Sequence, residues 1–424
     1  MKILMFGWEY SPQLTGGLGV VCKALCDELS KEHTIRFILP TAEKDIRKIT
    51  TRLSVEAVSD VPEEELNTEI EHSRLAFLNV GTNLLPYLPS DAFRNQEKTG
   101  DEHGATEDLE PRILKKIKLT GKYDKNLSAE VTKYTLLAAH FYEEEEFDII
   151  HAHDWMGANA ALLAKAILKI PLVFHIHSTE YDRNGPGGSE HIRSMERKAI
   201  EMADAIVCVS SKTKESIIKH YEADESKIWV VPNAVQWRMS NSKKDGDQPT
   251  IGFLGRFTAQ KAPGKFVDMA RLLENDDAGF RYKMIGDGYL MPQIKDKIHR
   301  NNLGKAFELT GFLTPGEVKS ILGKISLLVI PSVSEPFGLV ALEATAKGVP
   351  VIISKNAGVN EFIPFKTFDQ WDLHSMKDLA LSLIENETVA QQYLADCRKA
   401  MRKLSWKKSA GAIIGIYGEL TSPH

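Results

Sequence analysis

Short apolar runs alternate with longer amphipathic stretches along most of the chain. The first run covers Ile3–Gly7, and a glycine-rich turn separates it from an amphipathic helix predicted over Leu18–Glu32. A second apolar run, TIRFILP, follows this helix. The order strand, helix, strand is typical of a βαβ unit, in which the two strands are parallel.

Further strands are predicted wherever a short apolar run ends in polar residues. In the first half these runs are FDIIHAHDW, PLVFHIHSTE, AIVCVSS and KIWVVPNAV, and in the second half TIGFLGRF, YKMIGDG, FELTGF, SLLVIPS and VPVIIS. Nearly continuous apolar runs of this length indicate parallel strands buried on both faces. The polar, turn-rich stretch at about 89–114 predicts a long surface loop, and the 45–125 region around it gives no clear pattern.

These patterns predict an α/β protein with two doubly wound parallel sheets. The chain has 424 residues, which is more than one ordinary hydrophobic core supports. A polar segment at 236–249 separates two series of strands and helices, so we expect domains at 1–235 and 236–404. Ligands of open α/β sheets bind at the carboxyl ends of the strands, and two such sheets facing one another form a cleft there.

Composition narrows the class of protein further. With 43% hydrophobic and 26% charged residues the chain has the composition of a soluble globular protein, and a net charge of -5 does not suit nucleic-acid binding. The start, MKILMFGWEY, has too short an apolar run for a signal peptide, and no segment reaches the ~18 apolar residues of a membrane span. The four cysteines show no zinc-type pairing. We expect a cytoplasmic protein without stable membrane insertion.

The turn after the first predicted strand is a candidate ligand contact. Gly16 and Gly17 let the backbone approach a ligand, and the helix start beyond them favours an anion. The turn lacks the G-x-G-x-x-G pattern of dinucleotide-binding proteins, which counts against an NAD-dependent enzyme.

Two pairs of histidines stand at predicted strand ends. His151 and His153 alternate along one strand, so their side chains share a face, and His175 and His177 repeat the pattern on the next strand. The pairs are compatible with buried hydrogen bonding, with a polar group at the mouth of the cleft, or with a metal ion. We favour a site without a metal ion, because the second domain offers two cationic side chains that can balance the charge of an anionic ligand.

The sequence GRFTAQKAP in the second domain contains a pair of cationic residues. Arg256 and Lys261 follow the first strand of the second domain, across a turn that leads into a helix. Arginine can donate two parallel hydrogen bonds to oxygens, while lysine acts as a point charge, so together they suit a diphosphate.

Two glutamates lie eight positions apart in SVSEPFGLVALEATAKG. Pro336 biases Glu335 away from helical dihedrals, so Glu335 stands in a turn and Glu343 in the helix that follows. The two carboxylates could accept hydrogen bonds from hydroxyls on two parts of one extended ligand. Backbone N–H groups are free where this helix starts, and they belong to Phe337, Gly338 and Leu339.

In this order, these motifs resemble the retaining glycosyltransferases of GT-B fold. The motifs are TGGL, HAHDW, VVPNAV, MIGDG, TGFL and SEPFGL, and they are similar to those of glycogen and starch synthases and of the family-4 (group 1) transferases. The resemblance covers most of the chain outside 45–125. It implies two Rossmann-like domains, an acceptor-side domain and a nucleotide-sugar-binding domain, with a last helix at about 405–424 crossing back to the first.

The resemblance also implies roles for individual residues. Arg256 and Lys261 would bind the donor diphosphate and stabilise the leaving nucleotide without a metal ion or cofactor. His153 would stand beside the sugar at the reaction centre, Glu335 would contact the donor hexose and Glu343 the ribose. Further donor contacts would be Gly16, Gly17, Gly311, Phe312, Phe337, Gly338 and Leu339, and candidate acceptor contacts Glu9, His177, Glu180 and Arg183.

The activity implied is transfer of a hexose, which we expect to be glucose, from ADP-glucose or UDP-glucose to an α-glucan. Glycogen synthases carry a lysine shortly before the Gly-Gly turn where this chain has Leu14, so other acceptors stay open: a disaccharide, a surface polysaccharide or a glycolipid. A nucleotide-sugar 2-epimerase and a non-catalytic glucan-binding protein are the remaining alternatives. The HAHDW and E-x7-E patterns favour transfer over epimerisation, and the presence of His153, Arg256, Lys261 and Glu335 favours an active enzyme.

Overall fold

The computed structural model describes residues 1–12, 16–43, 46, 48–62, 117–121, 127–143, 145–241, 248–274 and 279–422. The surface loop predicted at about 89–114 lies outside these residues, and so does Leu14.

An eight-stranded sheet forms the centre of the first domain, with the strand order β3-β4-β2-β1-β5-β6-β7-β8. The strands are β1 (Lys2–Phe6), β2 (Thr34–Leu39), β3 (Lys48–Thr50), β4 (Leu53–Ala57), β5 (Ile149–His153), β6 (Leu172–Ile176), β7 (Ala205–Cys208) and β8 (Ile228–Val230). The strands from β4 to β8 in this order pair in parallel, whereas β3 is antiparallel to β4. The predicted parallel sheet is therefore present, with one antiparallel strand added at its edge.

A six-stranded parallel sheet forms the second domain, in the order β11-β10-β9-β12-β13-β14. The strands are β9 (Thr250–Leu254), β10 (Arg281–Ile285), β11 (Phe307–Gly311), β12 (Leu327–Ile330), β13 (Val351–Ser354) and β14 (Lys366–Phe368). The predicted runs correspond to the first five of these strands, and β14 was not predicted.

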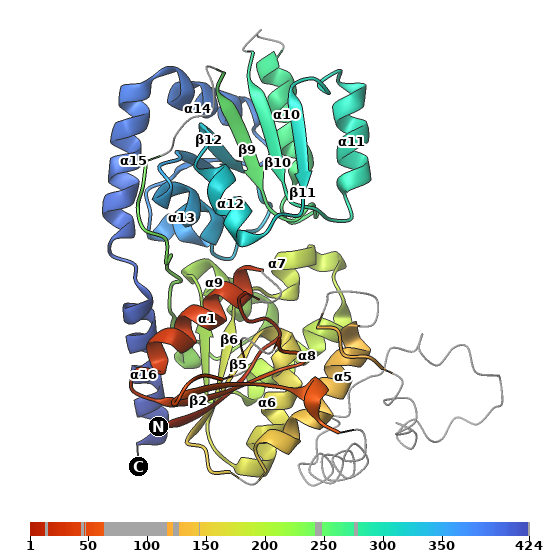
Figure 1. The fold of residues 1–424 in the computed structure, drawn as a ribbon, viewed down its shortest axis with the longest axis vertical. Coiled ribbons are helices and arrows are strands. Elements are labelled where there is room, and N and C mark those ends of the chain that lie inside the picture. Colours follow the sequence, from red (N-terminus) through yellow and green to blue (C-terminus); the bar gives the residue numbers. More distant parts are fainter. Residues whose placement is uncertain are drawn as a thin grey trace, which may run out of the picture.

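Helices cover both faces of each sheet (Figure 1). In the first domain they are α1 (Gly17–Leu29), α5 (Leu127–Leu137), α6 (Asp154–Leu168), α7 (Glu180–Asn184), α8 (Glu190–Met202) and α9 (Ser211–Tyr221). Later helices are α10 (Pro263–Glu274), α11 (Met291–Arg300), α12 (Pro315–Leu322), α13 (Leu339–Ala346), α14 (Leu373–Glu385), α15 (Glu387–Met401) and α16 (Trp406–Thr421). The short 3-10 turns are η2 (Val58–Asp60), η3 (Ala138–Phe141), η4 (Gly185–Gly187), η5 (Glu225–Lys227) and η6 (Gly358–Glu361).

The last helix, α16, lies against the first domain although it follows the whole second domain in the sequence (Figure 1). It packs on α1, and Trp406, Ile413 and Tyr417 are buried in the same core as residues of α1 and of β1. The two ends of the chain therefore lie side by side at the foot of the first domain.

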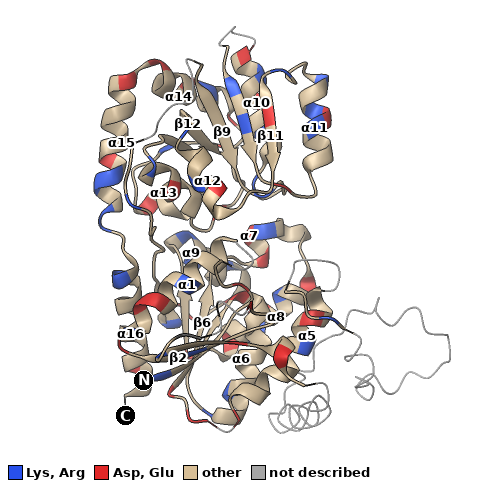
Figure 2. Cartoon of the chain, in the orientation of Figure 1, with Lys and Arg blue, Asp and Glu red and all other residues tan. Residues whose placement is uncertain are grey.

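Charged residues of both signs are interspersed on the outer helices. Figure 2 shows lysines and arginines beside acidic residues on α11 and α15. In the sequence of α11, for example, Asp296 directly follows Lys295. Within the described ranges, no helix combines the length and the apolar character needed to cross a bilayer.

Candidate active site

The two domains meet through loops that follow their strands. Ser334, in the loop after β12, donates a hydrogen bond to Asp182 of α7 over 3.0 Å. Ser210, which caps α9 after β7, donates to the carbonyl oxygen of Pro336 over 2.6 Å. Figure 1 shows α7 and α9 facing the second domain at this level. The polar strand ends of both sheets are thus directed toward one region, as parallel α/β sheets require of a ligand site.

Lys261 and Glu335 form an ion pair in this region. The Lys261 ammonium lies 2.6 Å from Glu335 Oε2, and Ser332 donates to the same oxygen over 3.0 Å. Glu335 is buried, and its backbone N–H and carbonyl are bonded to the loop that contains Asn356 and Gly358. Hydrogen bonds on both backbone and side chain fix the carboxylate, so the ammonium is fixed with it.

Arg256 lies in the same loop as Lys261 and is exposed. Among the described residues its guanidinium has no hydrogen-bond or ion-pair partner. The loop rests closely on the one after β10: a Cβ added at Gly286, whose φ is 127°, would lie 2.1 Å from the carbonyl oxygen of Gly255. Only glycine fits there, so the sequence MIGDG holds the cation-bearing loop in place.

The start of α13 presents free backbone donors. Gly338 precedes the helix with φ 112° and ψ 51°, a left-handed conformation that suits glycine. In the part of the chain that the structure describes, the N–H groups of Phe337, Gly338 and Leu339 have no acceptor. The sequence predicted these three free donors at a helix start, and they lie next to Glu335 in the chain.

Glu343 lies on α13, half-buried, and burial raises its pKa to about 7. Its side chain has no ion-pair partner among the described residues. The carboxyl group therefore stays in an environment that disfavours its charge.

Gly311 and Phe312 follow β11. Gly311 has φ 70°, and its carbonyl accepts from Gly286 N over 3.0 Å, which ties this loop to the loop after β10. Phe312 is 69% exposed, an unusually open position for a phenylalanine, and it is free to stack on a planar ligand.

The turn at Gly16 and Gly17 already holds an internal anion. Glu9 accepts hydrogen bonds from the N–H groups of Gly16 and Gly19, each over 3.1 Å. A Cβ at Gly16 would lie 2.5 Å from Glu9 Oε2, so glycine is needed for this contact. Glu9 thus caps α1 and uses the amides that the sequence suggested for a ligand anion.

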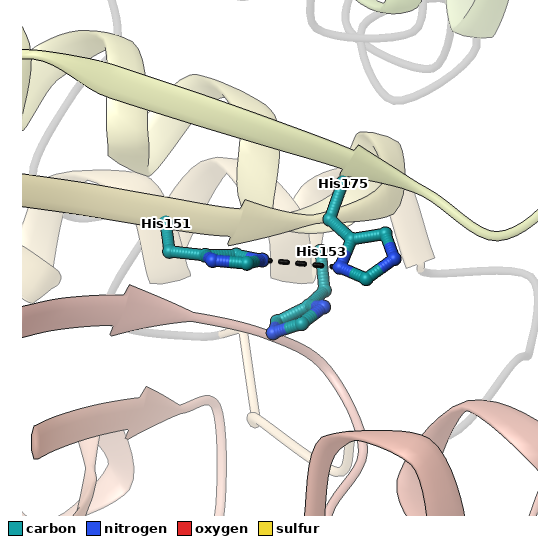
Figure 3. A group of neighbouring side chains, drawn as sticks. All are labelled: His151, His153 and His175. Atoms are coloured by element: carbon teal, nitrogen blue, oxygen red, sulfur yellow. Dashed lines mark hydrogen bonds between the residues drawn. The ribbon is translucent and has the colours of Figure 1, made fainter. Parts of the chain in front are cut away.

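Four histidines stack at the ends of β5 and β6. His153 contacts His177 through Nδ1 and Nε2 over 3.0 Å, and His151 Nε2 lies 3.2 Å from His175 Nδ1. Figure 3 shows the rings of His151 and His175 directed toward one another from neighbouring strands, with His153 beside both. His151 Nδ1 also contacts the hydroxyl of Tyr417 on α16. Burial lowers the pKa of all four imidazoles, that of His177 to about 3, so they are neutral at pH 7.

Asp154, the first residue of α6, orients the end of β6. It adopts φ 55°, uncommon for a residue with a side chain, and its carboxylate accepts from the N–H groups of His177 and Ser178 over 2.7 and 3.4 Å. Burial raises its pKa to about 6. The strained backbone places this carboxylate where it holds the His177 main chain.

Glu180 and Arg183 are engaged inside the first domain. Glu180 is buried and accepts from Arg183 Nε over 3.2 Å and from Ser189 N over 2.8 Å. Arg183 also donates to Glu196 over 2.7 Å. Burial raises the pKa of Glu196 to about 7 despite this contact. The two predicted acceptor contacts therefore join α7 to α8.

Sequence reasoning did not find the contacts that depend on long-range packing. They are Ser334 with Asp182, Asp154 with the backbone of His177, and Tyr417 with His151. The last pair is separated by 266 positions, and no local pattern indicates it.

Comparison with known proteins adds the family. A sequence model described as glycosyltransferase family 4 matches residues 99–236, and one described as glycosyl transferases group 1 matches residues 234–403. An uncharacterized glycosyltransferase of Methanocaldococcus jannaschii is 30% identical over 66% of this chain and 77% of the relative. The chain belongs to the group 1 glycosyltransferases.

Two further relatives of this group 1 glycosyltransferase match different shares of its length. A second uncharacterized glycosyltransferase of M. jannaschii is 26% identical over 98% of each chain. A glycogen synthase of Mycobacterium tuberculosis is 24% identical over 64% of this chain and 68% of the relative.

Solved structures show that the group 1 glycosyltransferase has the GT-B fold. Sucrose-phosphate synthase from Thermosynechococcus elongatus superposes with a TM-score of 0.74 at 15% identity, covering 99% of this chain and 98% of that one. Anabaena HepE in complex with UDP and glucose gives 0.70 at 14% identity, covering 99% and 100%. The fold predicted from the sequence is confirmed.

Proposed function

We propose that this group 1 glycosyltransferase moves glucose from a nucleotide-linked donor to an α-glucan, with retention of configuration and without a metal ion. The observation that carries the proposal is the Lys261–Glu335 ion pair beside the exposed Arg256. Two cations on loops at strand ends, one of them fixed by a buried carboxylate, suit a diphosphate and a sugar bound side by side.

The charge of the leaving group explains the two cations. Breaking the bond between the anomeric carbon and the phosphate oxygen develops negative charge on the nucleoside diphosphate and positive charge on the sugar ring. Arg256, Lys261 and the free amides at the start of α13 oppose the first charge with donors that are already oriented. Preorganised donors of this kind need little rearrangement during the reaction, and such a site can supply several kcal/mol of transition-state stabilisation.

Glu335 and His153 are the proposed contacts of the donor sugar. When a phosphate takes over the ammonium of Lys261, Glu335 becomes free to accept from hexose hydroxyls, and its carboxylate favours the positive ring. His153 Nε2 has no hydrogen-bond partner in the described part of the protein, and we assign a hydroxyl of the bound sugar as its partner. The acceptor hydroxyl then attacks the anomeric carbon on the face from which the nucleotide leaves. A glycosidic bond forms as the bond to the phosphate oxygen breaks, and the hydroxyl proton passes to the departing diphosphate.

Relatives support the choice of donor and acceptor. The glycogen synthase of M. tuberculosis supports an α-glucan acceptor, and the HepE complex with UDP and glucose supports a uridine-linked glucose donor. A D-inositol 3-phosphate glycosyltransferase of Corynebacterium efficiens is 25% identical and supports the alternative of a small acceptor.

The test supplies ADP-glucose or UDP-glucose with glycogen, maltooligosaccharides or a small polyol, in buffer containing EDTA. We expect nucleotide release, longer glucan chains and a new α linkage by NMR. Glycosylation of the polyol alone would refute the glucan acceptor and leave the transferase standing. A 2-epimer formed without acceptor would refute transfer, and activity that needs added magnesium would refute the metal-free mechanism.

A further inference from the structure

Three imidazoles of the histidine stack bring ring nitrogens close together. His151, His153 and His175 each provide a ring nitrogen, and these atoms lie within 4.8 Å of one another (Figure 3). The residues come from β5 and β6, where His153 is paired directly with His175 in the parallel register. The rigid centre of a sheet, rather than a loop, therefore sets their separation.

The stack is incompletely hydrogen-bonded. Three of its nitrogens, His153 Nε2, His175 Nε2 and His177 Nδ1, are buried and have no partner among the described residues. The His153 and His175 side chains are each 1% exposed. Most buried polar groups in folded proteins are paired, so the orphaned His153 Nε2 points to a missing partner. Neutral imidazole is a preferred ligand of zinc and copper ions.

We propose that His151, His153 and His175 bind a zinc-class transition-metal ion, with Zn²⁺ as the physiological candidate. The 3.2 Å between His151 Nε2 and His175 Nδ1 matches the separation of about 3.3 Å between two nitrogens on a tetrahedral zinc ion. His153 supplies the third nitrogen through its unpartnered Nε2. We assign the fourth ligand to a water molecule, as in zinc sites that exchange a ligand.

Proton positions are compatible with this site. The hydrogen bond between His151 and His175 holds one proton, which must leave before both nitrogens can face a cation. His175 Nε2 can carry it, so His175 changes tautomer and the cluster loses no proton. His151 Nδ1–H then donates to the Tyr417 hydroxyl, and His153 Nδ1–H donates to His177 Nε2. His151 and His153 then keep a second hydrogen bond, as metal-ligating histidines usually do, whereas His175 Nε2–H has no partner among the described residues.

Occupation of this site would regulate transfer. This consequence rests on the proposed function, in which His153 Nε2 contacts the donor sugar. A metal ion on the same nitrogen removes that contact, so zinc acts as an inhibitor of an enzyme that needs no metal for its reaction. Binding itself does not depend on the enzyme's being a transferase.

The experiment uses untagged, EDTA-treated protein without any nucleotide sugar. We titrate Zn²⁺ by calorimetry and Co²⁺ by visible absorption, and expect one equivalent of each metal and the intense bands of tetrahedral cobalt. His175→Gln is expected to weaken zinc binding at least about tenfold. His299→Gln, which removes an exposed histidine on α11, is the matched control and is expected to bind like the wild type.

Circular dichroism shows whether the His175→Gln variant folds. If it does not fold, the cobalt spectrum of the wild-type protein tests the site. Absence of tetrahedral cobalt bands, or the same zinc affinity in wild type and in a folded His175→Gln variant, would overturn the site. In the transfer assay, zinc should inhibit the wild type and the His299→Gln variant alike. Zinc that binds at the cluster without affecting a working transferase would overturn the regulatory consequence.

Discussion

At the scale of single residues, Arg256 gives the sharpest test of the diphosphate site. Its guanidinium is exposed and engages no other described group, so Arg256→Ala removes charge without leaving a buried partner. We expect kcat to fall ~10²-fold or more, by analogy with the loss of one oxyanion donor, while the melting temperature stays unchanged. The control is Arg271→Ala, an exposed arginine on α10. Steady-state kinetics near the wild-type values for both variants would rule out a role for Arg256.

Lys261→Ala should also impair transfer, but it differs from Arg256→Ala in one respect. It leaves the buried Glu335 without its cation. Loss of activity is then expected together with a lower melting temperature, because an unpaired buried carboxylate is unfavourable.

We expect the ionised carboxylate of Glu343 to lower the stability of the fold while it contributes to donor binding. Its pKa is about 7 in the folded chain and 4.5 ordinarily, so between these values the folded state binds more protons than the unfolded state. The contribution of Glu343 to stability therefore falls as pH rises through that window, and the loss is complete above about pH 7. Glu343→Gln should raise the melting temperature at about pH 8 by roughly 2 °C or more, and leave it unchanged at about pH 4.

The same variant should bind the donor less tightly, because its amide replaces the carboxylate proposed to hold the ribose. Differential scanning calorimetry and donor titration together measure both effects. Glu385→Gln, an exposed change at the end of α14, is the control and should alter neither. A Glu343→Gln protein with unchanged donor affinity would assign Glu343 to structure alone.

Much of the candidate site was predictable at the residue scale because its chemistry is local. Lys261 and Glu335 each stand in a turn after a strand, and the sequence placed both there; their contact over 2.6 Å needed the fold. Glu9 and Arg183 show the limit. Both were predicted as acceptor contacts from the family resemblance. Their partners, the amides of α1 and Glu196, are set by packing that sequence patterns do not contain.

At the scale of elements, the cap of α1 can be tested through Glu9. Glu9→Ala frees the amides of Gly16 and Gly19, so the unfolding free energy should fall by about 1–2 kcal/mol. Urea denaturation measures the change, with Glu32→Ala, an exposed residue after α1, as the control. A higher KM for acceptor at unchanged stability would instead assign Glu9 to the acceptor.

The predicted elements differ from the observed ones where signals are short or marginal. The first helix was predicted to reach Glu32 but ends at Leu29, where Ser30 N–H closes the last turn on Cys26. Strand β4 was missed in a region without clear pattern, although Leu53, Val55 and Ala57 alternate with polar residues and are buried. Strand β14 has three residues, too few for periodicity to indicate a strand.

At the scale of the whole molecule, the bond between Ser334 and Asp182 joins the domains beside the ion pair. Ser334→Ala removes this bond and leaves Lys261 and Glu335 in place. Because one neutral donor to a carboxylate is worth about 1–2 kcal/mol, we expect the donor KM to rise by about fivefold to thirtyfold with little change in melting temperature. The control is Ser320→Ala on the exposed face of α12. Unchanged KM in both variants would show that this contact does not hold the domains for catalysis.

The return of α16 to the first domain has a consequence for biosynthesis. A ribosome makes β1 and α1 early and α16 only after every strand of the second domain. The surface of the first core that Ile413, Ile416 and Tyr417 cover stays bare while the later residues are translated. Domains generally fold as units during synthesis, and bare apolar surface at that stage favours aggregation. The first domain therefore completes its core only when the final helix has been made, and until then it exposes apolar surface that favours aggregation.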